Sequence, residues 1–242
     1  MFAAAPPEEF EAALDATVAQ IFSATGVAGP PIDAQQIARA LTLTVAWDAR
    51  LAGRARIVQW QTGEGFHGSI LLRPEPRPER RQWAIAHEIG EAAAEQVFRL
   101  LAADPRDAPA ATRERIANQL AGRILLPSDW FFEAGAACDW DLLELKRVFA
   151  TASHELIARR MLDRSAALTM TVFDHGARTW RRSPFGRAGQ GVSFLEQACW
   201  RAAHERAEPA ERQDDSMRVR AWPIHEPNWK REILQTEFAS EE

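Results

Sequence analysis

Residues 81–91 read Arg-Gln-Trp-Ala-Ile-Ala-His-Glu-Ile-Gly-Glu, and this stretch decides the fold of the first half of the chain. Its apolar residues recur at helical spacing, which predicts a helix over residues 81–101. His87 and Glu91 are four positions apart, so their side chains lie one turn apart on one face, among apolar neighbours. Burying an imidazole beside a carboxylate is costly unless a metal ion or an arginine compensates the charge. The pattern therefore indicates a metal site or, as the simpler alternative, an ion pair with a nearby arginine.

Glu88 follows His87 directly and is expected to point toward a narrow polar sector of the helix, away from His87 and Glu91. In zinc peptidases with the motif His-Glu-x-x-His, the glutamate at this position is the general base that takes a proton from metal-bound water. The present chain has Glu91 where that motif has its second histidine. We interpret the stretch as an HExxE variant with Glu88 as the catalytic residue and His87 and Glu91 as metal ligands.

A second helix is predicted over residues 112–126, and Pro127 ends it. Glu114 lies on the apolar face of this helix, with Asn118 one turn later. Glu114 is expected to be the third metal ligand, and Asn118 is expected to hold it by a hydrogen bond. On its own, Glu114 would be read as a solvated helix carboxylate.

Together these residues resemble the ImmA/IrrE-type metallopeptidases, bacterial cytoplasmic enzymes whose better-known members act on repressors of the helix-turn-helix class. The resemblance covers about residues 8–165 and rests on ordered blocks at 29–33, 81–90, 114–118, 124–127 and 145–162. It implies His87 and Glu114 as ligands and Glu88 as the base. Glu91 is assigned as a ligand only by its position in the motif, because the family's usual residue at that position is histidine.

The ligand set determines which metal is expected. His/Glu/Glu ligation places two formal negative charges on a divalent ion, where His/His/Glu places one. The site should therefore be harder and less Lewis acidic, with weaker hydrolysis at neutral pH. We expect Zn²⁺, with Mn²⁺ or Fe²⁺ as alternatives. The chain has no tyrosine, so a side chain that stabilises an oxyanion would have to be histidine or arginine.

The predicted fold class is α+β, with a mainly helical metallopeptidase domain and a small antiparallel sheet over residues 1–165. Helices are expected at 8–24 and 34–41, the second capped by Asp33, followed by strands at 43–47, 55–60 and 69–72. By the same resemblance, residues 68–72 are expected to be the edge strand above the catalytic helix, where a substrate peptide could pair.

Residues 166–242 are predicted to form a β-rich appendage. The segments 168–173 and 178–182 flank a turn and indicate a hairpin, and further strands are expected at 217–222 and 232–238. The polar segment 205–215 is expected to be a mobile loop. The appendage is either a structural cap or a surface that senses a signal or docks a partner.

Composition limits the possible partners and location. The formal net charge of −5 argues against a chain-wide attraction to nucleic acid or to an anionic membrane. The two cysteines, Cys138 and Cys199, are far apart and outside any metal-binding spacing, which fits a reducing compartment. The first residues lack the pattern of a signal peptide, and no apolar run is long enough to span a bilayer. We expect a cytoplasmic protein with no membrane partner.

Three functions stay open at this point. The first is a metallopeptidase that cleaves a cytoplasmic regulatory protein, for which a helix-turn-helix repressor is the expected substrate. The second is a metal-binding pseudoenzyme that acts by docking a regulator. The third is a DNA-binding regulator, suggested by a helical pair around residues 151–153 that carries Arg159 and Arg160. This basic surface is small, so direct binding of nucleic acid is not expected.

Overall fold

The computed structural model describes residues 6–62, 65–184 and 191–239, with the backbone alone given for 59–62 and 65–67. The chain divides into two compact units, Met1–Ser153 and His154–Glu242. Helices and two separate sheets are present, which confirms the α+β class. No helix within the described ranges is long and apolar enough to cross a membrane. The domain boundary predicted after residue 165 stays a prediction.

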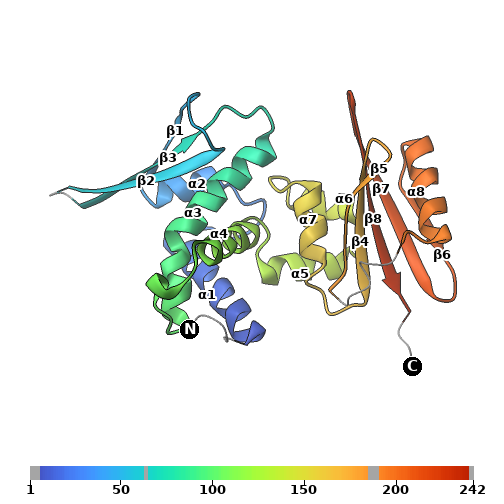
Figure 1. Cartoon of the computed structure of the whole chain (residues 1–242), viewed down its shortest axis with the longest axis horizontal. Helices are drawn as coiled ribbons and strands as arrows, with labels where there is room; N and C mark the ends of the chain where they lie inside the picture. The colour runs from blue at the N-terminus through green and yellow to red at the C-terminus, as the bar shows by residue number, and fades with distance from the viewer. Residues whose placement is uncertain (1–5, 63–64, 185–190, 240–242) are drawn as a thin grey trace. The chain divides into compact units, whose positions relative to one another are not determined.

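The first unit is built around one long helix. Helix α3 (Pro78–Leu100) packs against α4 (Ala110–Leu125) and against strands β2 (Ala55–Thr62) and β3 (Gly65–Leu72), as Figure 1 shows. The remaining elements are α1 (Pro7–Thr25), α2 (Ala34–Ala40), β1 (Leu43–Trp47), a short 3-10 turn (Pro105–Asp107), α5 (Ser128–Ala137) and α6 (Leu142–Val148). The strands and helices predicted for this part of the chain are present, with shifts of a few residues at their ends.

Helix α3 starts early because Pro78 occupies its first turn, where a missing N–H costs nothing. Its first half is then tied to the start of α2. Asp33 caps α2 as predicted, accepting a hydrogen bond from Gln35 N at 2.9 Å. The same carboxylate accepts from the Gln82 amide at 2.9 Å, and Gln82 Oε1 accepts from Ala34 N at 2.7 Å. Asp33, which caps α2, thereby also fixes the position of α3 through Gln82.

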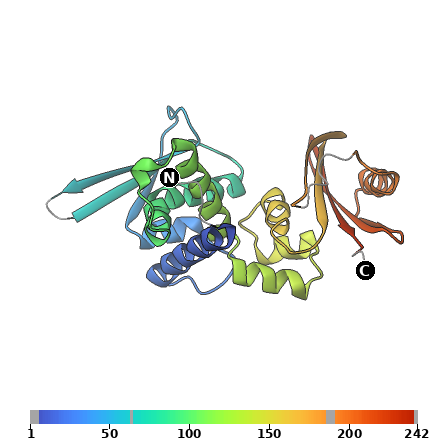
Figure 2. The same cartoon turned by 60° about the horizontal axis from the view of Figure 1, so that its bottom comes forward.

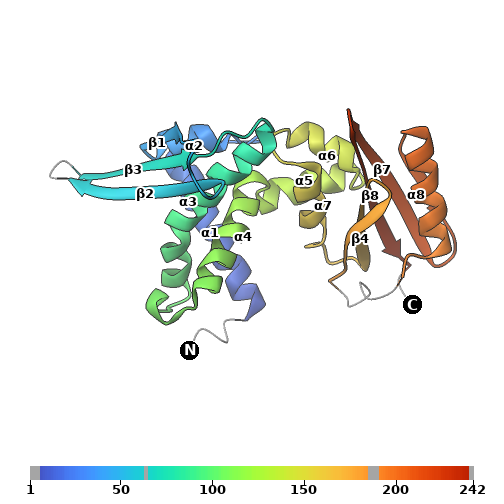
Figure 3. The same cartoon turned by 45° about the horizontal axis from the view of Figure 1, so that its top comes forward.

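The three-stranded sheet differs from the prediction in two respects. Its strand order is β1-β3-β2, and β1 pairs with β3 in parallel, so the sheet is mixed rather than antiparallel. Residues 68–72 lie in the central strand β3, paired with β1 on one side and β2 on the other, so the expectation that they form the edge strand is wrong. The sequence shows which residues form strands but not which strand lies in the middle. Strands β2 and β3 run side by side as a hairpin that extends beyond the helices (Figures 2 and 3).

Gly90 allows α3 and α4 to approach closely. A Cβ atom built at Gly90 would lie 2.7 Å from the carbonyl oxygen of Ala117 and 3.1 Å from Cβ of Leu120. The first distance is shorter than any normal contact, and its partner is backbone that cannot rotate away. The glycine between Ile89 and Glu91 is therefore required by packing, and it brings the polar face of α3 next to Glu114 on α4.

We expect Gly90→Ala to lower the free energy of unfolding by about 1–3 kcal/mol, the usual cost of overpacking a core. Alanine in a helix interior is otherwise preferred over glycine by up to about 1 kcal/mol. A decrease in the free energy of unfolding would therefore show that the close contact between α3 and α4 outweighs this preference. Urea denaturation measures this. Gly29→Ala is the matched control, because a Cβ at Gly29 meets nothing within 4 Å. Equal or higher stability of the Gly90 variant would contradict this packing.

The second unit is a five-stranded antiparallel sheet with helices on its two faces. Its elements are α7 (His154–Met161), β4 (Leu168–Asp174), β5 (Ala177–Arg182), α8 (Phe194–Arg206), β6 (Ala210–Gln213), β7 (Met217–Glu226) and β8 (Trp229–Phe238), and the strand order is β5-β4-β8-β7-β6. The predicted hairpin and the two later strands are confirmed. The expected loop over 205–215 is wrong, because it contains the end of α8 and the strand β6.

Helix α8 covers one face of this sheet. Its buried residues Cys199 and Ala203 pack on Val219, Ala221 and Leu234 of β7 and β8. Figure 3 shows the helix lying along these strands. A capping box starts the helix, in which Ser193 and Glu196 each accept from the other's backbone N–H. The helix ends at Arg206, shortly before β6, and it packs against β6, β7 and β8.

Candidate metal centre

His87 and Glu114 face each other across the contact between α3 and α4. The His87 Nε2 atom lies 3.7 Å from Oε2 of Glu114. The other carboxylate oxygen of Glu114 accepts a hydrogen bond from Nδ2 of Asn118 at 2.9 Å. His87 is partly buried whereas Glu114 is largely exposed. Two of the residues proposed from the sequence as ligands are thus adjacent, and a third residue restrains one of them.

Glu91 is placed differently from the other two candidate ligands. Its Oε1 atom lies 3.7 Å from Nε of Arg113, and both side chains are about a third exposed. Among the residues that the structure describes, the group of three His, Cys, Asp or Glu side chains with ligand atoms all within 4.8 Å of one another is His204, His225 and Glu232. In this structure Glu91 therefore forms the kind of ion pair that the sequence allowed as the simpler alternative.

Glu88 was expected to point toward a narrow polar sector of the helix, and the structure shows that it is buried. Only 7% of the residue is exposed, and its Oε2 atom accepts a hydrogen bond from the backbone N–H of Ile57 at 2.5 Å. Strand β2 covers this side of α3, so helical periodicity alone assigned the wrong environment. Burial raises the pKa of Glu88, while the Ile57 hydrogen bond and His87 oppose that rise. Glu91 and Glu114 add to the rise through their negative charge.

The donors present are compatible with a divalent metal ion. His87 offers an imidazole nitrogen and Glu114 a carboxylate that Asn118 already orients, a combination found in zinc sites. Glu91 is one helical turn from His87, and the ion pair that holds it, about a third exposed on both sides, is of a type worth about 0–1 kcal/mol. Releasing Glu91 from Arg113 is therefore a small cost compared with a coordinate bond.

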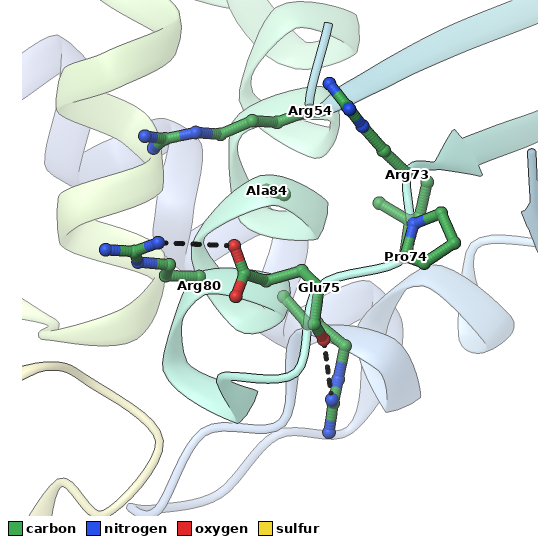
Figure 4. Close-up of a pocket in the computed structure, with 8 residues that line it drawn as sticks. Arg54, Arg73, Pro74, Glu75, Arg80 and Ala84 are labelled. Atoms are coloured by element: carbon green, nitrogen blue, oxygen red, sulfur yellow. Dashed lines mark hydrogen bonds and ion pairs between the residues drawn. The ribbon is translucent and has the colours of Figure 1, made fainter. Parts of the chain in front are cut away.

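A basic cavity adjoins the Glu88 side of α3. It has a volume of about 300 Å³ and is lined by Arg54, Leu72, Arg73, Pro74, Glu75, Arg80, Arg81 and Ala84. Figure 4 shows Arg54, Arg73 and Arg80 among the residues that line this cavity, with Arg80 3.4 Å from Glu75. Ala84 lies one turn before Glu88 on the same side of the helix. Four arginines against one glutamate make this cavity suited to an acidic group.

Several residues of this site were not identified from the sequence. Ile57 acts through its backbone N–H, for which no side-chain pattern exists. Arg113 directly precedes Glu114, but its pairing with Glu91 depends on how α3 and α4 pack. Arg54 and Arg73 are brought to the cavity by the β2–β3 pairing, since Arg73 N donates to Arg54 O at 2.9 Å. The sequence suggested one of these partners in general terms only, as an arginine that pairs with Glu91.

The two arginines that suggested DNA binding are used within the second unit. Arg159 pairs with Glu155 at 2.8 Å and lies over the ring of Trp180, 4.7 Å from its centroid. Arg160 is only 6% exposed and pairs with Asp163. Charges that are buried or paired in this way are not available as phosphate contacts. The geometry gives no support to a basic recognition surface on α7.

Comparison with known proteins agrees with the resemblance seen in the sequence. Residues 52–162 match the family model Peptidase_M78, described as the IrrE N-terminal-like domain. This segment is therefore similar to the IrrE N-terminal-like peptidase domain, and the resemblance to ImmA/IrrE proteins seen in the sequence is confirmed over these residues. The matched segment includes α3 and α4 and so contains the whole candidate centre.

A solved structure described as a Mycobacterium tuberculosis transcriptional regulator has a similar fold, with a TM-score of 0.60 and 16% sequence identity. The similarity covers 93% of the present chain and 87% of that one. At this identity the similarity concerns the fold alone. No curated protein matches the chain.

Proposed function

We propose that the first unit is a metal-dependent peptidase that cleaves a cytoplasmic regulatory protein. His87, Glu91 and Glu114 would hold a divalent ion, with Zn²⁺ first and Mn²⁺ or Fe²⁺ as alternatives. The observation that carries the proposal is the placement of His87, Glu114 and Glu88 around one helix contact inside the matched peptidase segment. The interaction of Asn118 with Glu114 supports it, because ligands of metals are commonly held by such hydrogen bonds.

The chemistry assigns one role to each group. When bound, a divalent metal supplies Lewis acidity to water and to the scissile carbonyl. Glu88 accepts the proton of the attacking water and passes it to the leaving amine. The raised pKa of Glu88 makes it a stronger base than an ordinary carboxylate once it is ionised. The Ile57 N–H holds one carboxylate oxygen, which fixes the direction of the other.

Strands β1 and β2 are the two edges of the sheet, and we propose that a substrate peptide pairs with β2. Strand β2 is at the end of the sheet order, and Ile57 uses its N–H for Glu88 instead of the ladder. A peptide that pairs in extended form beside β2 would pass close to Glu88. The basic cavity next to it would accept an acidic side chain of the same peptide. We therefore expect cleavage sites with a nearby aspartate or glutamate.

A pseudoenzyme that docks a regulator is the second candidate. The pairing of Glu91 with Arg113 favours it, because a centre that never bound metal would keep this ion pair permanently. The helix-turn-helix repressor is the expected partner under both candidates. The two differ in whether metal binds at α3 and α4, and this can be measured directly.

Metal titration tests the proposal. Full-length protein stripped with a chelator is titrated with Zn²⁺ by calorimetry, and Glu114→Gln is expected to bind one equivalent fewer than the wild type, because one of three ligands is lost. Glu95→Gln is the control, since Glu95 is an exposed carboxylate on the same helix α3. Identical titration curves for the wild type and the Glu114 variant would contradict the proposed ligand set.

A further inference from the structure

A second group of metal-ligating side chains lies in the unit His154–Glu242. His204 is in the last turn of α8, His225 is near the end of β7, and Glu232 is near the start of β8. One ligand atom from each lies within 4.8 Å of the other two. These three residues, called the α8 cluster, come from three different elements that pack on one another.

The strand register explains why two members of the α8 cluster meet. Glu232 pairs with Pro223 and His225 pairs with Lys230, so His225 and Glu232 are diagonal neighbours on the same face of the β7–β8 ladder. This face is the one that α8 covers. His204 lies one position beyond the buried Ala203 and reaches the same carboxylate from the helix.

The carboxylate of Glu232 is fully buried, while the two imidazoles are only partly so. Glu232 is 0% exposed, and the His204 and His225 side chains are 29% and 18% exposed. Both rings approach the same oxygen: His204 Nδ1 lies 2.9 Å and His225 Nε2 2.6 Å from Oε1. The other oxygen, Oε2, accepts from the indole Nε1 of Trp200 at 3.1 Å. A buried carboxylate needs a compensating charge, and here its partners are two histidines and an indole.

This arrangement matches what a divalent transition metal requires. Two imidazole nitrogens and one carboxylate form a frequent protein ligand set for Zn²⁺, which leaves a fourth position open. With bonds of about 2.0–2.2 Å, the ligand atoms of a tetrahedral site are about 3.4 Å apart. The histidine nitrogens would thus need to move less than about 1 Å from the carboxylate, and their partly exposed rings leave room for this. Trp200 already orients the carboxylate from behind, as partners outside the ligand shell do in metal sites.

We propose that His204, His225 and Glu232 form a Zn²⁺ site in the second unit, separate from the centre on α3 and α4. The inference does not depend on peptidase activity, since it concerns other residues in another unit. The site joins α8 to the β7–β8 hairpin, so bound zinc stabilises the packing of α8 on the sheet. Its open position is on the exposed side of the two rings.

The test uses the full chain with His87→Gln, which removes a proposed ligand of the first centre. After chelator treatment this variant is expected to bind one equivalent of Zn²⁺ at the α8 cluster and to melt at a higher temperature when zinc is added. Adding His225→Gln should weaken zinc binding by at least about 100-fold. Replacing a residue that only holds a ligand in place usually costs roughly 10–100-fold in metal affinity, so the loss of a ligand should cost more. Trp200→Phe, which removes only the indole N–H, should weaken it about tenfold.

The control is His175→Asn, which removes a histidine of the same unit that packs on Trp229 and lies outside the α8 cluster. It should bind zinc as its parent does. If His225→Gln fails to fold by circular dichroism, His204→Gln on the helix surface replaces it. The proposal would be overturned if the His87→Gln parent bound no zinc, or if the cluster variants bound zinc as tightly as this parent does. The α8 cluster would then be a hydrogen-bonded group only.

Discussion

Replacing Glu88 with glutamine is expected to abolish proteolysis while metal binding is retained. A general base contributes roughly 10²–10⁴-fold to a rate, so at least a 100-fold loss should follow. Glutamine keeps the size of the side chain, and its carbonyl oxygen can still accept from Ile57 N, so the local structure should be preserved. The loss would then report the missing proton acceptor and not a disturbed fold.

New protein N-termini in cells provide the readout, because the substrate need not be known in advance. Cells that express the wild-type chain should contain cleaved regulator fragments that are missing in cells with Glu88→Gln. Glu95→Gln serves again as the control carboxylate on α3. Fragments that persist in the Glu88 variant would rule out its role as base, whereas an intact biological effect without any fragments would favour the docking pseudoenzyme.

Glu196→Gln is expected to cause the largest loss of stability, about 3–5 kcal/mol, because it leaves a buried arginine without its counter-charge. Arg181 and Glu196 are 5% and 1% exposed and lie 2.8 Å apart. Thr236 Oγ1 donates to the same carboxylate at 2.5 Å, and the Ser193 N–H donates at 2.7 Å. One carboxylate thus joins the start of α8 to strands β5 and β8.

Thermal denaturation of Glu196→Gln, with the exposed Glu208→Gln as control, measures this loss. The pH dependence gives a second readout. Burial alone would raise the pKa of Glu196, but the hydrogen bonds from Arg181, Thr236 and Ser193 outweigh it and lower the pKa below its ordinary 4.5. A lowered carboxyl pKa stabilises the fold above the ordinary value and loses that effect as the pH falls through the folded value. The stability difference from wild type should therefore shrink in acid, and a constant difference would contradict the ion-pair account.

The parts of the fold that follow local rules were predictable. Asp33 has the position and chemistry of a helix cap, and it caps α2. The alternation in residues 168–182 identified a hairpin. The helix α8 was missed because residues 194–206 are only weakly amphipathic, although Ser193 and Glu196 have the spacing of a capping box that could have revealed it.

The candidate centre was predictable only as a set of residues. The pattern around His87 and the family resemblance named them, but the burial of Glu88 depends on strand β2 crossing α3. The pairing of Glu91 with Arg113 likewise depends on the α3–α4 contact at Gly90. The α8 cluster joins residues up to 28 positions apart, His204 and Glu232. Such long-range arrangements have no periodic signature in the chain.

A crystal structure of the full chain grown with Zn²⁺, with anomalous diffraction at the zinc edge, tests the central claim most directly. We predict an anomalous peak bonded to His87 and Glu114, with the Glu91 carboxylate turned away from Arg113 to become the third ligand. No peak between α3 and α4, with Glu91 still paired to Arg113 at saturating zinc, would contradict the metallopeptidase assignment.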